Sequence, residues 1–338
     1  MKSKSADSVI HKELNKELSK EFLISIYREM LLYRRFEERV NLSYTQQKFS
    51  GFCHLHIGQE ALCVGVQRTL TPEDYMISGY RSHTQAIAKG IDPKRVFAEL
   101  YGKVEGCSQG KGGSMHMFSK EARFLGGHGI VGGQAPIALG VGFAIRYRKE
   151  SSIIVCYLGD AAMNQGAVFE AMNMAQTWKL PVLFVIENNH YGMGTAIQRT
   201  TSIDHLYKRA HAFDMPCSQV DGMDVKTVFL HVKPIVDAMR GKGGKTSGPY
   251  LLEALTYRYK GHSVSDPATY RSKDEVLAYQ KRDPLLTLAE ELKSKHGVLD
   301  KALEELDQGV RAEVKVAEQF ADQSSYPEDE AAWMNVFA

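Results

Sequence analysis

The chain has 338 residues, of which 43% are apolar, so it can bury a large core in one big α/β domain or in two smaller ones. This composition excludes a disordered chain. Its 42 basic and 40 acidic residues give a formal net charge of +2, which is too balanced to indicate nucleic acid or an acidic membrane surface as a partner.

Residues 1–20 predict a polar arm, and residues 21–338 predict a single α/β domain with a helical C-terminal part. The arm lacks the apolar core of a secretory signal, and Asp7, Glu13 and Glu17 argue against a mitochondrial transit peptide. No apolar run approaches the roughly 20 residues of a membrane span. We therefore expect a cytoplasmic chain of bacterial type, which a processed protein of an organelle matrix or stroma would resemble.

The sequence of the first half of the domain predicts two helices followed by a glycine-rich loop. Apolar residues at helical intervals predict a helix over Glu21–Tyr44, and proline in a first turn predicts another over Pro93–Leu100. Gly102–Gly133 is too rich in glycine to be helix or strand throughout, and it lies inside the chain. We expect this segment to form a loop shaped around a ligand.

The second half predicts a βαβ unit between further helices. A helix of small residues is expected over Ala135–Tyr147, followed by strand, helix and strand within Ile153–Thr195. One stripe of the middle helix should pack on the sheet: Val168, Ala171, Met172, Ala175 and Trp178. The remaining predictions are a helix, a strand and a charged helix: Val225–Arg240, Tyr250–Leu255 and Asp283–Ala321. This order predicts an α/β fold with a mostly parallel sheet flanked by helices.

The βαβ unit carries polar residues where each of its two strands ends. The first strand ends in Gly159-Asp160 and the second in Asn188-Asn189. Because parallel strands joined by a right-handed crossover end at the same edge of a sheet, we expect Asp160 and Asn189 to lie side by side. Their oxygens, beside a helix N-terminus, suit Mg²⁺ holding a diphosphate better than zinc or a bare anion. The alternative for these residue types is helix capping and turn formation.

Several short motifs have simpler explanations than the sites they suggest. Residues 127–132 match G-x-G-x-x-G, but no predicted strand precedes them, which argues against a nicotinamide site. Gly244-Lys245-Thr246 predicts a surface turn rather than a P-loop. His54 and His56 would share a face in a strand, but no third zinc ligand follows. The five cysteines include no C-x-x-C pair, which fits a reducing compartment.

Blocks of sequence along most of the chain carry a family resemblance. In this order and spacing they resemble the alpha subunits of the first component of thiamine diphosphate-dependent 2-oxo acid dehydrogenases, from about Glu21 to Gln319. The first and last blocks are more similar to pyruvate enzymes than to branched-chain ones. The blocks are GFCHLHIGQEA (Gly51–Ala61), GYRSH (Gly79–His83), GKGGSMHM (Gly110–Met117), Gly126–Gly133, Gly159–Gly166, Glu187–Thr195 and YRYKGHSVSDP (Tyr257–Pro267).

The resemblance implies roles for individual residues. Asp160 and Asn189 would ligate Mg²⁺ through their side chains and Tyr191 through its backbone carbonyl. His54, His262 and Arg258 match active-site positions. Arg258 and His262 lie in the segment from Tyr257 to Arg271, which in this family leads into and forms a loop over the active-site channel. The implied cofactor contacts are Tyr80, Arg81, Gly129, Val131, Asp160, Ala161, Ala162, Asn189, Tyr191 and His262.

The same resemblance implies an activity and partners. Thiamine diphosphate and Mg²⁺ would serve oxidative decarboxylation of pyruvate, and an acetyl group would pass to a lipoyl domain of the dihydrolipoyl acetyltransferase core. A beta subunit would complete the site in an α₂β₂ heterotetramer. Acetoin or branched-chain 2-oxo acid dehydrogenase alpha subunits, and a non-catalytic scaffold of the same fold, remain alternatives. Ser263 occupies a position that is phosphorylated in animal enzymes, but we expect an ordinary loop serine here.

One position departs from the family pattern. Where the family reads Gly-Asp-Gly, this chain has Ala161 after Gly159-Asp160. A right-handed backbone accepts alanine without strain, so we expect cofactor binding to survive and only its affinity to change.

Overall fold

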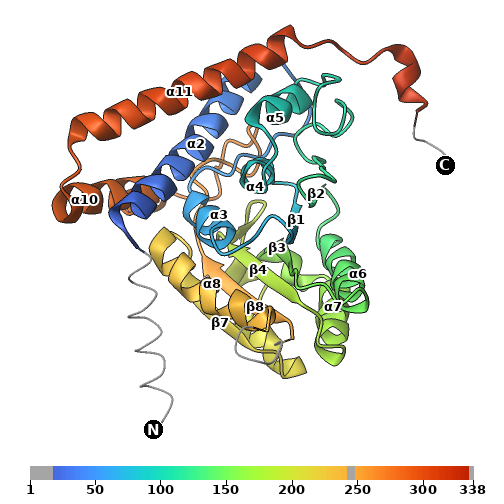
Figure 1. Ribbon diagram of the computed structural model, residues 1–338. Coiled ribbons are helices and arrows are strands. Elements are labelled where there is room, and N and C mark those ends of the chain that lie inside the picture. Colours follow the sequence, from blue (N-terminus) through green and yellow to red (C-terminus); the bar gives the residue numbers. More distant parts are fainter. Residues whose placement is uncertain (1–17, 242–247, 335–338) are drawn as a thin grey trace.

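The computed structural model describes residues 18–241 and 248–334 (Figure 1). The turn expected at Gly244-Lys245-Thr246 lies outside these ranges, as does the polar arm up to residue 17. Ser19, near the end of the expected arm, caps the first described helix, because its hydroxyl accepts a hydrogen bond from the backbone N–H of Phe22 at 3.1 Å.

A six-stranded sheet in the order β2-β1-β3-β4-β8-β7 forms the centre of the molecule. Every pair of neighbouring strands in it is parallel, which confirms the predicted α/β fold. Its strands are β1 (Tyr75–Gly79), β2 (Phe124–His128), β3 (Ile154–Gly159), β4 (Val182–Asn188), β7 (Cys217–Asp221) and β8 (Tyr250–Leu255). A separate hairpin pairs β5 (Tyr191–Gly192) with β6 (Thr195–Ala196).

Helices cover both faces of the sheet because successive strand residues point to opposite sides (Figure 1). On β3, Val155 and Tyr157 join one buried core, while Ile154 and Cys156 join the other. The first core contains residues of α2 (Lys20–Thr45), α3 (Glu60–Gln67), α4 (His83–Ala88), α5 (Pro93–Leu100), α8 (Val225–Met239), α10 (Pro284–His296) and α11 (Asp300–Gln323). The second contains residues of α6 (Gln134–Tyr147) and α7 (Gly166–Thr177).

Most predicted elements are confirmed, including the βαβ unit formed by β3, α7 and β4. The helix expected over Asp283–Ala321 is instead two helices, since the chain turns at Gly297 with a φ of 62°. Trp178 was wrongly assigned to the core stripe of α7: it follows the end of that helix and is 42% exposed. The chain also forms elements that we did not predict, among them β1, α3, α4 and α9 (Lys273–Gln280).

The glycine-rich segment differs from the prediction in one respect. It contains β2, which pairs with β1, and α6 begins at Gln134 after it. The G-x-G-x-x-G run at 127–132 therefore does connect a strand to a helix, contrary to our expectation. Two glycines at the end of β2 concealed the strand, because glycine is depleted in strands. His54 and His56 likewise lie in an irregular segment and not in a strand.

None of the helices in the described ranges is both long and apolar enough to cross a membrane.

Candidate active site

A cavity of about 300 Å³ lies at the carboxyl ends of the strands. The chain runs from β1 to β2 on one side and then to β3 on the other, so the strand order reverses at β1. Ligands of parallel α/β sheets bind at such a reversal. Of the residues implied by the resemblance, those that line the cavity are Tyr80, Arg81, Val131, Asp160, Ala161, Ala162, Asn189, Tyr191 and Arg258. Gly129, His54 and His262 are not among its described lining residues.

Asp160 and Asn189 follow neighbouring strands, as the βαβ pattern predicted. Gly159 at the end of β3 pairs with Glu187 near the end of β4, which brings the two following turns to one edge. Asp160 is 2% exposed, and its Oδ2 atom has no hydrogen-bond partner among the described residues. Burial raises the pKa of its carboxyl to about 6. An unpaired buried carboxylate oxygen is costly, so this atom fits a bound cation or donor.

Asn189 and Tyr191 present further oxygens at the same edge. The Asn189 amide donates through Nδ2 to Gln59 Oε1 at 3.2 Å, which leaves Oδ1 facing the backbone N–H of Tyr191 at 3.4 Å. One carboxylate, one amide oxygen and one carbonyl are the hard ligands that Mg²⁺ accepts. No group of three or more His, Cys, Asp or Glu side chains in the described ranges could hold a metal. The residues present therefore fit Mg²⁺ bound together with a diphosphate better than a metal bound by protein alone.

Arg258 lies beside these oxygens. Its Nη1 atom donates to the Tyr191 carbonyl at 2.9 Å and to Asn189 Oδ1 at 3.4 Å, and the side chain is 1% exposed. Nη2 donates to the Tyr270 hydroxyl at 2.7 Å and to the Met193 carbonyl. A carbonyl oxygen has two lone pairs, so the Tyr191 carbonyl can accept from Arg258 and still ligate a cation. Arg258 thus joins the expected metal ligands to the loop that carries His262.

His54, His262 and Tyr80 form an aromatic cluster next to the cavity. The His54 ring centroid lies 4.5 Å from that of Tyr80 and 5.0 Å from that of His262. Burial, together with the charge of Arg81, lowers the pKa of His54 to about 2 and that of His262 to about 4. Both imidazoles are therefore neutral at physiological pH. The Nδ1 atoms of both rings are buried and have no hydrogen-bond partner in the structure.

Arg81 connects the two segments that carry these histidines. Its Nη1 atom donates to the Leu55 carbonyl at 2.6 Å, and Nη2 donates to the His262 carbonyl at 2.9 Å. The guanidinium therefore holds Leu55 and His262, which lie far apart in the sequence, against the turn that follows β1. A substituted guanidinium carries five N–H donors, so others remain for an anionic ligand in the cavity.

Ala161 begins a short 3₁₀ turn, and its φ is not positive, in contrast to those of nine other described non-glycine residues. The backbone at this position therefore accepts a methyl group, as the sequence predicted. Space for that methyl comes from Gly192, because a Cβ atom there would lie 2.5 Å from the Ala161 Cβ.

Several residues of the cavity wall were not predicted from the sequence. Gln59, Gln134, Gln165 and Glu187 line it, and a side-chain amide atom of Gln59 and of Gln134 is buried without a partner. Gln59, Gln165 and Glu187 lie inside blocks that carry the family resemblance, so their positions were a usable signal. Gln134 begins α6 outside those blocks, where only the structure shows which way its side chain points.

The parallel sheet, and a cavity of oxygen and guanidinium groups at its carboxyl edge, define an α/β protein of the kind that binds phosphate-bearing cofactors. Residues 28–330 match the model of the family described as dehydrogenase E1 component. The chain belongs to this family, whose members depend on thiamine diphosphate.

Named relatives cover most of the chain. It is 49% identical over 319 residues to the pyruvate dehydrogenase E1 component subunit alpha of Zymomonas mobilis, covering 94% of this chain and 89% of that protein. The subunit of the same name from Rhizobium meliloti is 47% identical over 313 residues, 92% of this chain and 89% of that protein. The mitochondrial one of Dictyostelium discoideum is 42% identical over 321 residues, 94% and 83% of the two chains.

Proposed function

We propose that this chain is the alpha subunit of a pyruvate dehydrogenase first component, which oxidatively decarboxylates pyruvate and acetylates a lipoyl group. The observation that carries the proposal is one cavity lined by nine of the residues implied by the family, in a chain that is 49% identical to a named pyruvate subunit over 94% of its length. When bound, thiamine diphosphate supplies the nucleophilic carbon and the electron sink for loss of CO₂.

Residues that follow β1, β3 and β4 would share the binding of the cofactor's diphosphate, some through a metal and some by direct contact. Asp160, Asn189 and the Tyr191 carbonyl would hold Mg²⁺, and the unpartnered Oδ2 of Asp160 supports this assignment. Tyr80 and Arg81 would contact the diphosphate, while Gly129 and Val131 would face the aminopyrimidine with their backbones. Ala161 and Ala162, which begin the short turn after Asp160 and line the cavity, would also contact the cofactor.

His54 and His262 would act on the substrate as neutral imidazoles. A neutral ring can donate from one nitrogen and accept at the other, so either residue can move a proton as pyruvate adds or as the acyl group leaves. Their buried, unpartnered Nδ1 atoms support this role, because they have hydrogen-bonding capacity that the protein leaves unused. Arg258 would join the loop that carries His262 to the metal ligands.

We further propose that a beta subunit covers the mouth of the cavity in an α₂β₂ heterotetramer. Ile130, next to the lining residue Val131, is 80% exposed, which is unusual for a large apolar side chain and supports a covered surface there. The lipoyl domain and core of the acetyltransferase would be the acyl acceptor. A single domain over 21–338 and a cytoplasmic location of the chain stay predictions.

Steady-state kinetics of the chain co-purified with its beta subunit test this function. We expect the complex to reduce an artificial acceptor with pyruvate, only with thiamine diphosphate and Mg²⁺ present, and with a higher kcat/KM for pyruvate than for acetoin or a branched 2-oxo acid. A preference for acetoin or a branched substrate would reject pyruvate specificity. Absence of turnover and of cofactor binding would favour the scaffold.

A further inference from the structure

Three buried polar side chains form a hydrogen-bonded chain behind His54. They come from three separate segments: Glu37 from α2, His83 from the first turn of α4, and Ser114 from the glycine-rich segment. The His83 Nδ1 atom lies 2.9 Å from Glu37 Oε2, and its Nε2 atom lies 2.8 Å from Ser114 Oγ. Ser114 Oγ in turn accepts a hydrogen bond from the backbone N–H of His54 at 3.4 Å.

Only one arrangement of protons satisfies this chain when His83 is neutral. The Glu37 carboxylate can only accept, so His83 must carry its proton on Nδ1. Nε2 is then an acceptor, and the Ser114 hydroxyl donates to it. That hydroxyl keeps a lone pair for the His54 N–H. All donors therefore point toward the buried carboxylate, and each bond depends on the one before it.

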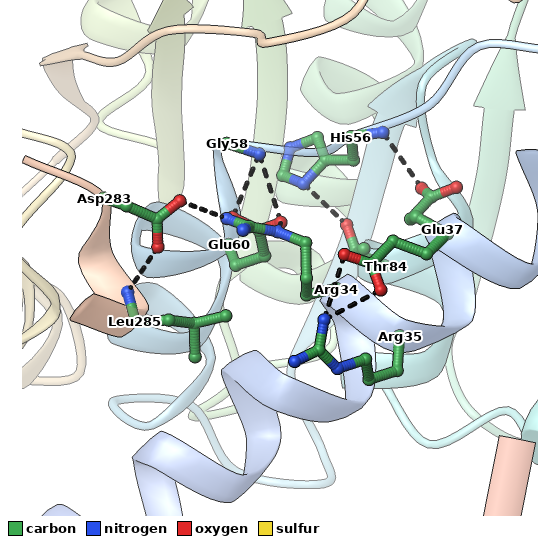
Figure 2. A network of polar contacts seen from close by, with 10 residues as sticks. Arg34, Arg35, Glu37, His56, Gly58, Glu60, Thr84, Asp283 and Leu285 are labelled. Carbon is green, nitrogen blue, oxygen red and sulfur yellow. Dashed lines mark hydrogen bonds and ion pairs between the residues drawn. The ribbon is translucent and has the colours of Figure 1, made fainter. Parts of the chain in front are cut away.

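The other oxygen of Glu37 holds the next part of the same segment directly. The backbone N–H of His56 donates to Glu37 Oε1 at 3.0 Å, which Figure 2 shows from close by. One turn earlier on α2, Arg34 binds Glu60 with 2.6 Å between Nε and Oε1, and the same carboxylate accepts from the Gly58 N–H at 3.1 Å (Figure 2). Helix α2 therefore fixes the backbone of the segment from His54 to Glu60.

The His54 imidazole depends on this backbone for its orientation. Its Nδ1 atom has no hydrogen-bond partner, so the direction of the ring follows from its Cα position and its contacts with Tyr80 and His262. Displacing a reacting group by about 1 Å can reduce a rate by roughly a hundredfold. His83 also follows Tyr80-Arg81 closely, so one imidazole links the cofactor-contacting turn to the His54 segment.

We propose that His83 is a positioning residue for His54 and acts through Ser114 from the fixed carboxylate of Glu37. The inference rests on the proposed function, because it assumes that His54 takes part in the reaction. Ser114, His83 and Glu37 have the residue types of a hydrolase triad, but the Ser114 oxygen is buried and already bound to two groups, so it serves as a bridge.

A double-mutant cycle on the co-purified complex tests the proposal. Ser114→Ala and His83→Asn should each lower kcat for pyruvate by roughly ten- to a hundredfold and leave the Kd of thiamine diphosphate within about twofold. Ser114→Thr keeps the oxygen and should restore most of the rate. In a His54→Ala background, Ser114→Ala should cause no further loss, because the serine acts through His54. Ser119→Ala is the matched control, because Ser119 is a buried serine of the same segment whose hydroxyl bonds, within the described part of the chain, to Glu121 and Ala122.

Each outcome separates the proposal from its premise. If the wild-type complex does not turn over pyruvate, or if His54→Ala retains full activity, the proposed function or the role of His54 fails first. If the wild type is active and His54→Ala impairs it, but Ser114→Ala lowers kcat by the same factor in both backgrounds, the positioning role is wrong. Should His83→Asn not fold, Ser114→Ala and Ser114→Thr, together with the His54→Ala background, still test the positioning role.

Discussion

The Ala161 methyl group packs where the backbone of Gly192 comes close to the turn after β3. A Cβ at Gly192 would lie 2.5 Å from the Ala161 Cβ and 3.9 Å from its Cα, and apart from residues 191–193 no other described heavy atom would lie within 4 Å of it. The two positions therefore share one small space. A residue pattern that looks irregular in sequence is accommodated by a glycine 31 positions later.

A double-mutant cycle can test this packing. We expect Gly192→Ala to destabilise the chain by about 1–3 kcal/mol, because overpacking forces the backbone apart. Ala161→Gly in the same chain should recover most of that loss, and alone it should change the affinity for thiamine diphosphate only a few fold. Thermal unfolding and cofactor titration measure both effects. Simple addition of the two single effects would contradict the shared space.

The neutral histidines predict how stability depends on pH. In an unfolded chain the pKa of a histidine is about 6.5, whereas burial and the charge of Arg81 lower the pKa of His262 to about 4. As the pH falls below the unfolded value, the unfolded chain takes up a proton that the folded chain does not, so the free energy of unfolding decreases. The loss ends once the pH has passed the folded pKa.

The thermal midpoint of the wild type should therefore fall more steeply between about pH 6.5 and about pH 4, the window set by those two pKa values, than that of His262→Asn. The variant has no group at this position that titrates in that window. Equal slopes for the two proteins would show that His262 is not held neutral by the fold.

At the scale of elements, Asp266 organises the loop that carries His262. Its carboxylate accepts from the His262 N–H at 2.6 Å, from the Ala268 N–H at 2.8 Å and from the Tyr270 hydroxyl at 2.8 Å. The Tyr270 hydroxyl also accepts from Arg258, which contacts the expected metal ligands. Asp266 therefore ties three points of the loop together, beside the bond from Arg81 to the His262 carbonyl and those from Arg271 to the carbonyls of residues 258–260.

We predict that Asp266→Ala increases hydrogen exchange and proteolytic cleavage within residues 261–271, because it removes all three bonds. Tyr270→Phe should have a smaller effect, since it removes the hydroxyl alone. Ser265→Ala is the control, because the Ser265 hydroxyl bonds to the hydroxyl of Ser263 at 3.0 Å and not to the Asp266 carboxylate. Unchanged exchange in Asp266→Ala would mean that other contacts order the loop.

The sequence predicted the elements whose apolar residues follow a regular period. The strands β3 and β4 are continuous apolar runs, and α2 repeats apolar residues at helical spacing. It did not predict β7, whose residues CSQVD are mostly polar at an edge of the sheet, or β2, whose residues FLGGH include two glycines. Neither strand shows a local pattern, because pairing with a neighbour determines both.

Part of the site could also be predicted, because it lies at the ends of strands that the sequence predicted. Asp160 and Asn189 follow from strand ends alone, and the remaining contacts follow from the family resemblance. The chain from Glu37 through His83 to Ser114 has no sequence signal, because its members are 46 and 31 positions apart. Buried polar partners of this kind are identified only when the tertiary structure brings them together.

At the scale of the whole molecule, one edge of the sheet gathers the site from five strands. Residues after β1, β2, β3, β4 and β8 line a single cavity, and two cores on opposite faces hold those strands in register. The proposed function therefore requires the ends of β3 and β4 to hold the cofactor's diphosphate through a metal.

Calorimetric titration of thiamine diphosphate into the co-purified complex, with and without Mg²⁺, measures this requirement. We expect tight binding only with Mg²⁺, and a loss of affinity of about ten- to a hundredfold in Asp160→Ala with the melting temperature preserved. Asp221→Ala, which removes a carboxylate that pairs with Arg282 outside the cavity, should bind as the wild type does. Equal affinity of wild type and Asp160→Ala, or binding that does not depend on Mg²⁺, would show that these strand ends do not hold the diphosphate through a metal.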